Sequence, residues 1–488
     1  METSGSDLPK LLQTILGTFI DLCGCDGGSI FTLHKDASGV EFLVFETMIT
    51  RSIRLHQVPE EVSYLRFPVD ESSLVGRTAQ MRKVQKESFS KAASDENRVD
   101  QLLNFTTRNI LSAPLVTPRG DLVGVVQLLN KLPFPGGGDT NPIVKEDPDF
   151  DARDERLVSC VAGQAALAIE NSLLLEEQER LLEGFVKACV TAVEARDPVT
   201  SGHSQRVAEY SVALADAVSR TQTGEYGSTN FSPLQIRELR YAAVLHDIGK
   251  ISVRENVLNK EKKLFPWDLE LIHMRLKLMR AELRRQEAQS GRDVTEEVKQ
   301  IESAWKMIQT ANEPNVLFAS VEKVLSGIAT VIVNTQEGET LEVLNAHEKE
   351  QLSIGRGTLT AVERVEIERH VSNTYEILKR VPWSRGLDQV AEIAYKHHEK
   401  LDGSGYPCHL GSTEIPVQSR ILTICDIYDA LTSQDRTYKH AIAWERAVRI
   451  LEQDVRGGKL DASLMKIFVE ARVFEHVHIF TEEIRRAA

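Results

Sequence analysis

The hydrophobic pattern of roughly the first 150 residues predicts strands and helices in alternation. Strand-like runs occur at residues 29–34, 40–49, 110–116 and 122–129. Turn-forming residues 35–39 join the first two runs and residues 118–121 join the last two, so each pair predicts a β-hairpin. A helical pattern at residues 73–84 lies between the hairpins. We therefore expect an α+β domain in this part of the chain.

The pattern becomes helical from Asp151, which can cap the helix that follows the Gly-, Pro- and Asp-rich loop at residues 134–149. Within residues 151–190, alternating spacings of four and three are occupied by Leu167, Asn171, Leu174, Gln178, Leu181, Phe185 and Ala188. This spacing is typical of a coiled coil between two copies of a chain, so we expect a linker helix that forms a homodimer. Because two of these positions are polar, a single amphipathic helix packed on its own domain is the alternative.

Residues 183–488 are almost entirely helical by periodicity. A charged helical stretch at residues 274–313 is interrupted at residues 290–293, which predicts a helical hairpin. A short strand-like run follows at residues 329–334. No internal repeat is evident in the sequence.

Composition narrows the classes of protein that fit this pattern. The 488 residues are 42% hydrophobic and 27% charged, which is typical of a globular protein with several domains. The net charge of −14 argues against nucleic-acid binding. No uncharged apolar run approaches the roughly 18 residues of a membrane span, and no cleavable leader is evident, so we expect a cytoplasmic protein without a membrane segment. The six cysteines lack Cys-x-x-Cys spacing, and we interpret Cys23 and Cys25 as buried thiols.

The chemistry-bearing residues of the helical region are histidines that accompany carboxylates. They are His203, the pair His246-Asp247, His370, the run His397-His398-Glu399, and Asp426. Imidazole and carboxylate together suit mid-row divalent metal ions. Two such ions close together can activate water and stabilise the charge of a phosphoryl group, so phosphoester hydrolysis is the reaction that this set favours.

Two of these segments resemble the signatures of a known family. The sequence Val-Leu-His-Asp-Ile-Gly-Lys-Ile at residues 244–251 resembles the signature of HD-domain metal phosphohydrolases. The sequence His-His-Glu-Lys-Leu-Asp-Gly-Ser-Gly-Tyr-Pro at residues 397–407 resembles the HD-GYP signature, and residues 197–207 and 420–432 complete the pattern. The resemblance implies an all-α domain at residues 185–488 that hydrolyses the bacterial messenger cyclic di-GMP to linear pGpG. It also implies two divalent metal ions, of which iron and manganese are frequent in the family.

The resemblance also implies roles for individual residues. One ion would be held by His203, His246, Asp247 and Asp426, and the second by the bridging Asp247 with His370, His397 and His398. Asp247 and Lys250 would be catalytic. The substrate would contact Lys250, Gly405, Tyr406, Arg436 and Lys439, although surface charge or ordinary packing explains several of these residues equally well.

The sequence departs from the family pattern at three places. Val199 stands where members with a third metal carry Glu, and Glu194 is too far from His203 to be assigned as its replacement, which favours pGpG as the product. An insertion at residues 262–357 separates His273 from His370, and residues after His370 match the family pattern better. Thr437 replaces the usual proline.

The N-terminal part, residues 1–172, resembles a GAF domain in its order of hairpins and helices. Its motif of Asn130, Lys131, Phe150, Asp154 and Glu155 resembles the motif of GAF domains that bind cyclic AMP or cyclic GMP. A Lys131–Asp154 ion pair could transmit occupancy of a ligand pocket to the linker helix, or could be a purely structural link.

The sequence as a whole therefore predicts a multidomain protein: an N-terminal α+β GAF-like sensor, a long linker helix and a C-terminal all-α HD-GYP domain with an inserted subdomain. The expected activity is a metal-dependent cyclic di-GMP phosphodiesterase under GAF control. The alternatives are a non-catalytic cyclic di-GMP receptor and a hydrolase of another cyclic dinucleotide.

Overall fold

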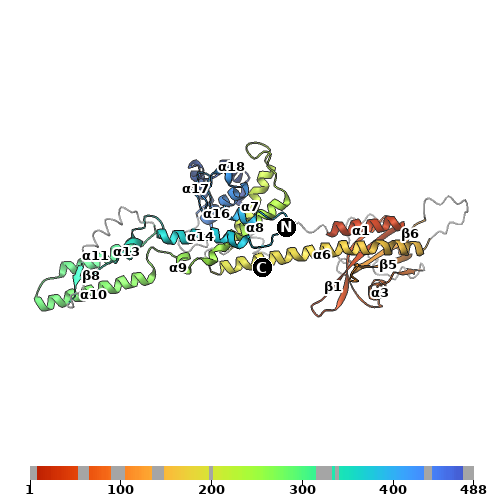
Figure 1. The fold of residues 1–488 in the computed structure, drawn as a ribbon, viewed down its shortest axis with the longest axis horizontal. Helices are drawn as coiled ribbons and strands as arrows, with labels where there is room; N and C mark the ends of the chain where they lie inside the picture. Colours follow the sequence, from red (N-terminus) through yellow and green to blue (C-terminus); the bar gives the residue numbers. More distant parts are fainter. Residues whose placement is uncertain are drawn as a thin grey trace. The chain divides into compact units, whose positions relative to one another are not determined.

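The computed structural model describes residues 8–52, 65–89, 105–133, 148–196, 202–314, 332–335, 340–433 and 442–475. The chain divides into two compact units, Met1–Glu183 and Gly184–Ala488, and each has a core of its own (Figure 1). Four residues discussed above, Val199, Arg436, Thr437 and Lys439, lie outside the described residues.

The first unit is built around a six-stranded antiparallel sheet with the strand order β3-β2-β1-β6-β5-β4. The strands are β1 (Cys25–Lys35), β2 (Glu41–Thr50), β3 (Arg66–Pro68), β4 (Gln85–Ser88), β5 (Asn109–Val116) and β6 (Leu122–Lys131). Both predicted hairpins, β1–β2 and β5–β6, are confirmed. The two hairpins join through β1 and β6, where Gly28 pairs with Leu128, so the first and last long strands form the centre of the sheet.

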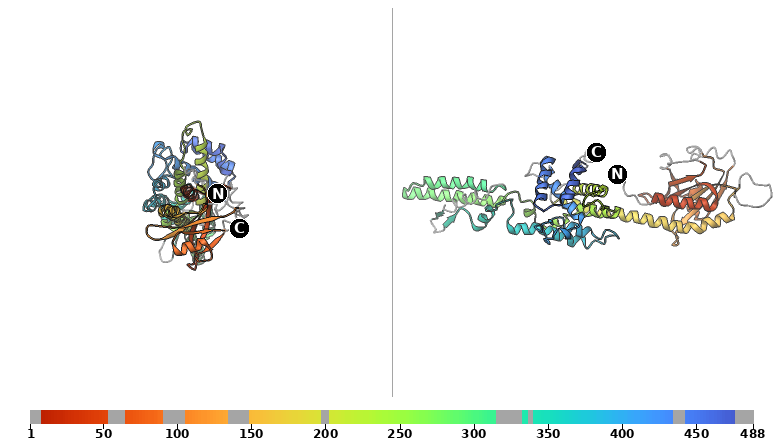
Figure 2. Two further views of the ribbon diagram at one scale, coloured as in Figure 1. Left: turned by 90° about the vertical axis from the view of Figure 1, so that its right-hand side faces the viewer. Right: turned by 90° about the horizontal axis from the view of Figure 1, so that it is seen from above.

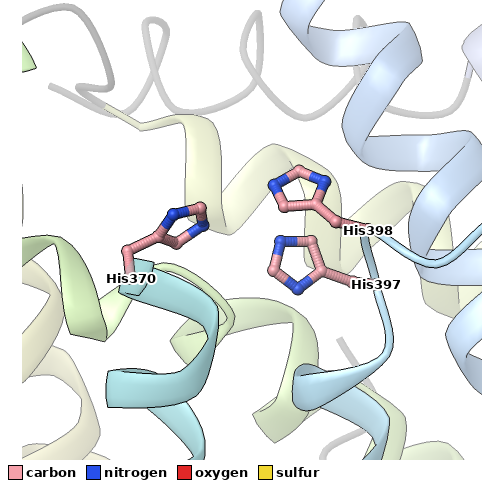
Figure 3. A group of neighbouring side chains, drawn as sticks. All are labelled: His370, His397 and His398. Atoms are coloured by element: carbon pink, nitrogen blue, oxygen red, sulfur yellow. The ribbon is translucent and has the colours of Figure 1, made fainter. Parts of the chain in front are cut away.

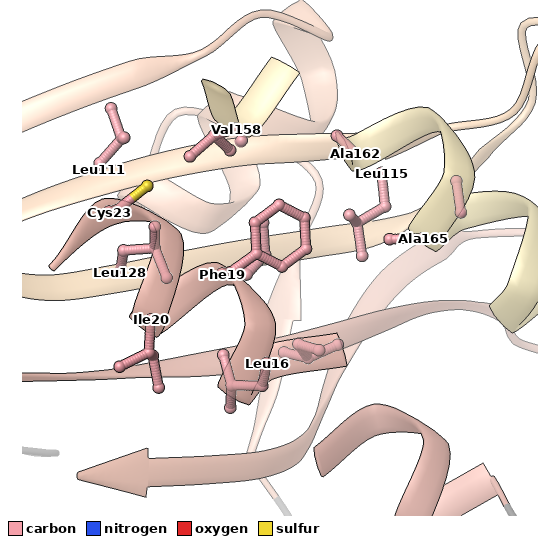
Figure 4. Packing of buried hydrophobic residues seen from close by; sticks show 14 of the residues in the cluster. Leu16, Phe19, Ile20, Cys23, Leu111, Leu115, Leu128, Val158, Ala162 and Ala165 are labelled. Carbon is pink, nitrogen blue, oxygen red and sulfur yellow. The ribbon is translucent and has the colours of Figure 1, made fainter. Parts of the chain in front are cut away.

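Helices cover both faces of this sheet. Helix α1 (Leu8–Cys23) and the first part of α6 (Ala152–Glu194) share one hydrophobic core with β1, β5 and β6 (Figure 4). Helix α3 (Leu74–Met81) packs against the opposite face through Val75 and Ala79. The sequence analysis did not predict α1, although its buried residues Leu12, Leu16, Phe19 and Ile20 follow helical spacing.

Helix α6 is long and apolar, and its first part lies in the core of the first unit. It contains an 18-residue window with a mean hydropathy of 1.4, so by length and composition it could cross a membrane. The sequence expectation concerned an uninterrupted run of about 18 uncharged apolar residues, and this helix contains no such run, because Glu170 and other polar residues interrupt it. Val158, Ala162, Ala165, Ala166 and Ile169 lie in the core of the first unit, so burial explains the part of the window that they occupy, which is 28% buried as a whole.

The described part of the second unit is almost entirely helical, as predicted. Helices α7 (His203–Arg220), α8 (Pro233–Leu245), α14 (Ala361–Leu378), α15 (Val390–Tyr395) and α16 (Val417–Thr432) surround the residues of the HD-type motifs. Short helical segments η2 (Ile248–Ser252) and α9 (Glu255–Leu258) follow α8, and α17 (Trp444–Arg456) and α18 (Ala462–Glu470) pack on α16.

The predicted insertion extends from the other helices of the second unit (Figure 2) and packs around a hydrophobic core of its own. Helices α10 (Pro266–Ser290) and α11 (Thr295–Ala311) form the expected hairpin, and the interruption falls at the predicted residues 290–293. A two-stranded sheet of β7 (Ile332–Asn334) and β8 (Thr340–Glu342) follows with α13 (Ala346–Leu352). Ile272, Leu276 and Met279 of α10 pack against Ile301 and Ile308 of α11, so this hairpin has its own core.

Candidate metal centre

The motif histidines and aspartates come from five helical segments and meet in the interior of the second unit. His203 is the first residue of α7, and His246 and Asp247 lie where α8 passes into η2. His370 lies on α14, His397 and His398 follow α15, and Asp426 lies on α16. Three groups of these residues have potential ligand atoms within 4.8 Å of one another: His203 with His246 and Asp247, His246 with His397 and Asp426, and His370 with His397 and His398. Figure 3 shows the last of these groups.

Backbone carbonyls fix the tautomer of three histidines. Nδ1 of His246 lies 2.7 Å from the Ala243 carbonyl, and Nδ1 of His397 lies 2.6 Å from the Ala394 carbonyl. Nδ1 of His370 makes the same contact, at 2.5 Å, with the carbonyl three residues earlier. Because a carbonyl only accepts hydrogen bonds, each Nδ1 carries the hydrogen and each Nε2 keeps its lone pair.

The Nε2 atoms of these same histidines are buried without a hydrogen bond in the structure. A buried polar nitrogen without a partner costs free energy, and a metal ion would satisfy it. Burial lowers the pKa of His398 to about 3, and burial, with the neighbouring imidazoles of His398 and His246, holds the pKa of His397 well below its usual range. Both rings are therefore neutral, which is the form that binds metal.

Asp247 lies between two of the histidines. Its Oδ2 atom is 3.2 Å from Nε2 of His246, and its Oδ1 atom is 3.2 Å from Nε2 of His370. Lys250 contacts Oδ2 at 2.8 Å. Burial would raise the pKa of this carboxyl group, but His246 and Lys250 outweigh burial and hold the pKa well below its usual range. The carboxylate is thus ionised and presents one oxygen to each side, as a bridging ligand requires.

Asp426 and His203 form the far side of the cluster, with Oδ1 of Asp426 3.2 Å from Nε2 of His203. Asp429, one helical turn beyond Asp426, contacts Nδ1 of His203 at 2.7 Å and accepts two hydrogen bonds from Arg206, at 2.8 and 3.0 Å. Burial would lower the pKa of His203, but the two carboxylates raise it to about 9. The sequence analysis did not predict that Asp429 orients His203. The signals were visible, because Asp429 follows Asp426 by three residues and Arg206 follows His203 by three residues, so each pair lies on one face of its helix.

The structure brings His370 into the cluster and leaves His273 in the insertion. A Cβ atom on Gly249 would lie 2.0 Å from the His370 carbonyl, so η2 and α14 approach as closely as a glycine allows. Thr374 joins the same two segments, since its hydroxyl accepts from the Gly249 amide at 2.9 Å and donates to the His246 carbonyl at 3.0 Å. The His273 ring instead lies 4.3 Å from the ring of Trp305 on α11.

The loop after His398 forms one wall beside the cluster. The Tyr406 ring lies 4.8 Å from the His398 ring, and the Tyr406 amide donates to the His398 carbonyl. A Cβ atom on Gly405 would lie 2.4 Å from the Lys400 amide nitrogen, so this turn requires glycine. The buried Glu399 accepts hydrogen bonds from the amides of Cys408 and Leu410 and holds the loop in place.

The motif residues of the first unit form a structural link. Lys131 at the end of β6 contacts Asp154 of α6 at 2.7 Å and donates to the Cys23 carbonyl at 2.5 Å. Asn130 has a positive φ of 56°, a conformation that asparagine tolerates, and its side chain bonds the backbone of Thr106 and Arg108. The link therefore joins the ends of α1 and β6 to the start of α6.

The remaining two residues of this motif play different parts. Phe150 is buried in the core that α1 shares with α6. Glu155 forms a more exposed ion pair with Lys86, at 2.8 Å.

Comparison with known proteins agrees with this division of the chain. The GAF domain family matches residues 7–169, and two HD domain families match residues 200–315 and 347–464. The GAF and HD assignments are thereby confirmed: the chain contains a GAF domain and two regions that match HD domain families. A structure of a GAF domain/HD domain protein from Geobacter sulfurreducens covers 35% of this chain and 95% of its own, with 12% identity and a TM-score of 0.25.

Several curated bacterial proteins are similar to part of this chain. A probable cyclic di-GMP phosphodiesterase of Vibrio cholerae is 26% identical over 60% of this chain and 45% of its own length. A 3'3'-cGAMP-specific phosphodiesterase 1 of the same organism is 35% identical over 25% of this chain and 28% of its own length. The chain therefore spans less than half the length of these relatives.

Proposed function

We propose that this protein is a metal-dependent phosphodiesterase that hydrolyses cyclic di-GMP to linear pGpG. The observation that carries the proposal is the convergence of three buried, unpaired Nε2 atoms on the two ionised carboxylates of Asp247 and Asp426. Neutral imidazole and ionised carboxylate in one buried cluster form a donor set for mid-row divalent ions. The names of the relatives support a cyclic dinucleotide as the substrate class.

The donor set divides naturally between two ions. His203, His246, Asp247 and Asp426 would hold one, and Asp247, His370, His397 and His398 would hold the other. Bound ions would supply an activated water and offset the charge of the phosphoryl oxygens. We propose iron or manganese, because nitrogen and oxygen donors suit both ions.

The chain's own residues orient the ligands and the substrate in this proposal. Asp429 holds the His203 ring, and the carbonyl contacts hold the rings of His246, His370 and His397 so that each Nε2 faces inward. Lys250 places a positive charge 2.8 Å from Asp247, where it can contact a substrate phosphate. Tyr406 offers a ring beside His398 against which a base can stack. Gly405 shapes that wall, and Arg436 and Lys439 are proposed phosphate contacts on the resemblance alone.

A related cyclic dinucleotide is the second candidate substrate. Three curated relatives of Vibrio cholerae are named 3'3'-cGAMP-specific phosphodiesterases, and one of them is 49% identical over 84 residues. The two substrates differ in one base, so discrimination would depend on contacts to that base's edge. A receptor without catalysis is the third candidate. The complete set of metal ligands counts against a receptor, because binding of the dinucleotide alone does not require all of these ligands.

We also propose that the GAF domain and α6 regulate this activity through a homodimer. Leu174 and Leu181 of the predicted seam are 56% and 68% exposed in the single chain, as expected of positions that a second copy covers. A cyclic nucleotide is the proposed GAF ligand. The link between Lys131 and Asp154 is the proposed route by which occupancy reaches α6.

The test is hydrolysis by purified protein reconstituted anaerobically with iron or manganese. Cyclic di-GMP and 3'3'-cGAMP are incubated in parallel and the products are resolved by chromatography, beside an Asp247→Asn variant. Accumulating pGpG that the variant does not form supports the proposal. Preferred cleavage of 3'3'-cGAMP would move the assignment to the second candidate. Rapid release of GMP would overturn pGpG as the end product, and tight binding without turnover with either metal would favour the receptor.

A further inference from the structure

Helix α10 of the insertion carries apolar residues on two faces, and within the described part of the chain only one of these faces is buried. Ile272, Leu276, Met279 and Leu283 are buried against α11 and the rest of the insertion core. A second row of large apolar side chains is between 51% and 59% exposed: Trp267, Leu271, Met274 and Leu278. Isolated exposed apolar residues are common, but four of them in line on one helix form a surface that favours a partner.

The spacing of this row, which we call the α10 seam, is that of a helix–helix contact. Its members are separated by four, three and four residues, the spacing at which one face of a helix meets another helix. Trp267 is also held in place, because its ring stacks on Phe265 with centroids 4.6 Å apart and planes at 11°. A fixed aromatic side chain at one end is typical of an interface anchor.

The charges beside the α10 seam show which partner fits. Glu270 and Lys277 flank the row on one side, and Asp268 and Arg275 flank it on the other. On both sides the acidic residue precedes the basic residue by one heptad. Two copies of α10 that run antiparallel therefore place acid against base on both sides, and they place Trp267 of one copy against Leu278 of the other.

We propose that the α10 seam pairs with the α10 seam of a second copy of this chain, antiparallel and around a two-fold axis. Such an interface is self-complementary, because the same surface serves both partners. Glu270 and Lys277 form no ion pair within the described part of the chain, so both are available. Arg275 is already bound to Glu348, so the Glu270–Lys277 side carries most of the charge complementarity.

The partner's orientation is testable because the two alternatives bring different residues together. A parallel pair would place the Glu270 and Lys277 side of one copy against the Asp268 and Arg275 side of the other. It would also place Leu278 opposite Leu278. Residues 267 and 278 of one chain are about 16 Å apart along the helix, so a disulfide between them must join two chains.

The experiment is disulfide cross-linking of the full-length protein with the double variant Trp267→Cys/Leu278→Cys under mild oxidation, read on non-reducing gels. The controls are the wild type, both single variants, and Lys306→Cys at an exposed site on α11. We expect a covalent dimer at several times the control yield. No cross-link above the controls would overturn the proposal, and efficient cross-linking of Leu278→Cys alone would overturn the antiparallel orientation.

A charge exchange provides an independent readout on the same cross-link. Glu270→Lys or Lys277→Glu alone should lower the cross-linking rate severalfold, since each places like charges together. The combined exchange should restore the rate, because acid and base again face each other in an antiparallel pair. Failure of the double exchange to restore the rate would contradict the antiparallel pairing. All of these positions are exposed, so the fold itself should be unaffected.

Discussion

Single hydrogen bonds decide which atoms of the candidate metal centre are available. Each carbonyl that accepts a hydrogen bond from Nδ1 of His246, His370 or His397 leaves the lone pair of Nε2 in that ring available to a metal ion. Asp429 makes the equivalent contact with Nδ1 of His203 through a carboxylate oxygen, and Arg206 donates a hydrogen bond to the same carboxylate. The centre therefore depends on residues that would never touch the metal.

We predict that Asp429→Asn lowers the affinity for manganese about 10- to 100-fold, because loss of the carboxylate charge removes the group that orients His203. Calorimetric titration of the metal-free protein measures this affinity. Asp216→Asn changes an exposed aspartate on the same helix as His203 and is the matched control. Equal affinities for both variants would show that Asp429 does not orient the ligand.

The cysteines differ sharply in environment. Burial raises the pKa of Cys23 to about 11 and of Cys25 to about 12, and it raises the pKa of Cys425 further, whereas Cys160 and Cys408 are exposed. A raised pKa means that the thiol stays protonated at pH 8, and burial also hinders a reagent.

We predict that iodoacetamide at pH 8 alkylates Cys160 and Cys408 in the folded protein and leaves Cys23, Cys25 and Cys425 unmodified. Peptide mass spectrometry measures the modification of each residue. Alkylation in denaturant is the control that all sites can react. Rapid modification of Cys23 or Cys25 in the native protein would contradict the interpretation of this pair as buried thiols.

At the scale of secondary structure elements, the Lys131–Asp154 ion pair joins parts of the chain that are distant in sequence. The two side chains are only 17% and 5% exposed, and Lys131 also bonds the last residue of α1. Removal of one partner would leave a buried charge without compensation. Glu155 and Lys86 of the same region form a pair that is far more exposed, and such a pair contributes little to stability.

We predict that Lys131→Met destabilises the first unit by about 3–5 kcal/mol, which lowers its melting temperature by on the order of 10 °C. Thermal unfolding followed by circular dichroism checks this. Glu155→Gln is the matched control and should leave the melting temperature nearly unchanged. A similar effect of both substitutions would mean that burial of the Lys131–Asp154 pair is not what stabilises the domain.

At the scale of the whole molecule, the chain consists of two units with separate cores. The candidate ligands all lie in the second unit, and the Lys131–Asp154 link lies in the first. Metal binding to the native state stabilises only the unit that holds the metal.

We predict two calorimetric unfolding transitions for the metal-loaded protein. Chelation with EDTA should lower the transition of the second unit and leave that of the first in place, while Lys131→Met should shift the first. Asp247→Asn, which removes the proposed bridging ligand, should make the second transition insensitive to EDTA. A single transition that moves as a whole would show that the two units unfold together.

Much of this architecture could be predicted from local pattern. Alternation and turn residues predicted the β1–β2 and β5–β6 hairpins, and the interruption at residues 290–293 predicted the α10–α11 turn. These elements depend on neighbours in sequence, so their signals are local. Helix α1 was missed although its apolar spacing was helical, and β3 and β4 have only three and four residues, too few for a clear period.

The sequence by itself determined which residue types were available for a metal site and which motifs carried them. Only the tertiary structure placed His370 beside the other candidate ligands and His273 away from them, because this placement depends on the contact of Gly249 with α14 across more than a hundred residues of chain. It also revealed Asp429 as the partner of His203 and separated the buried face of α10 from its exposed one. Such decisions depend on which segments meet in space, and sequence periodicity carries no information about partners that are distant along the chain.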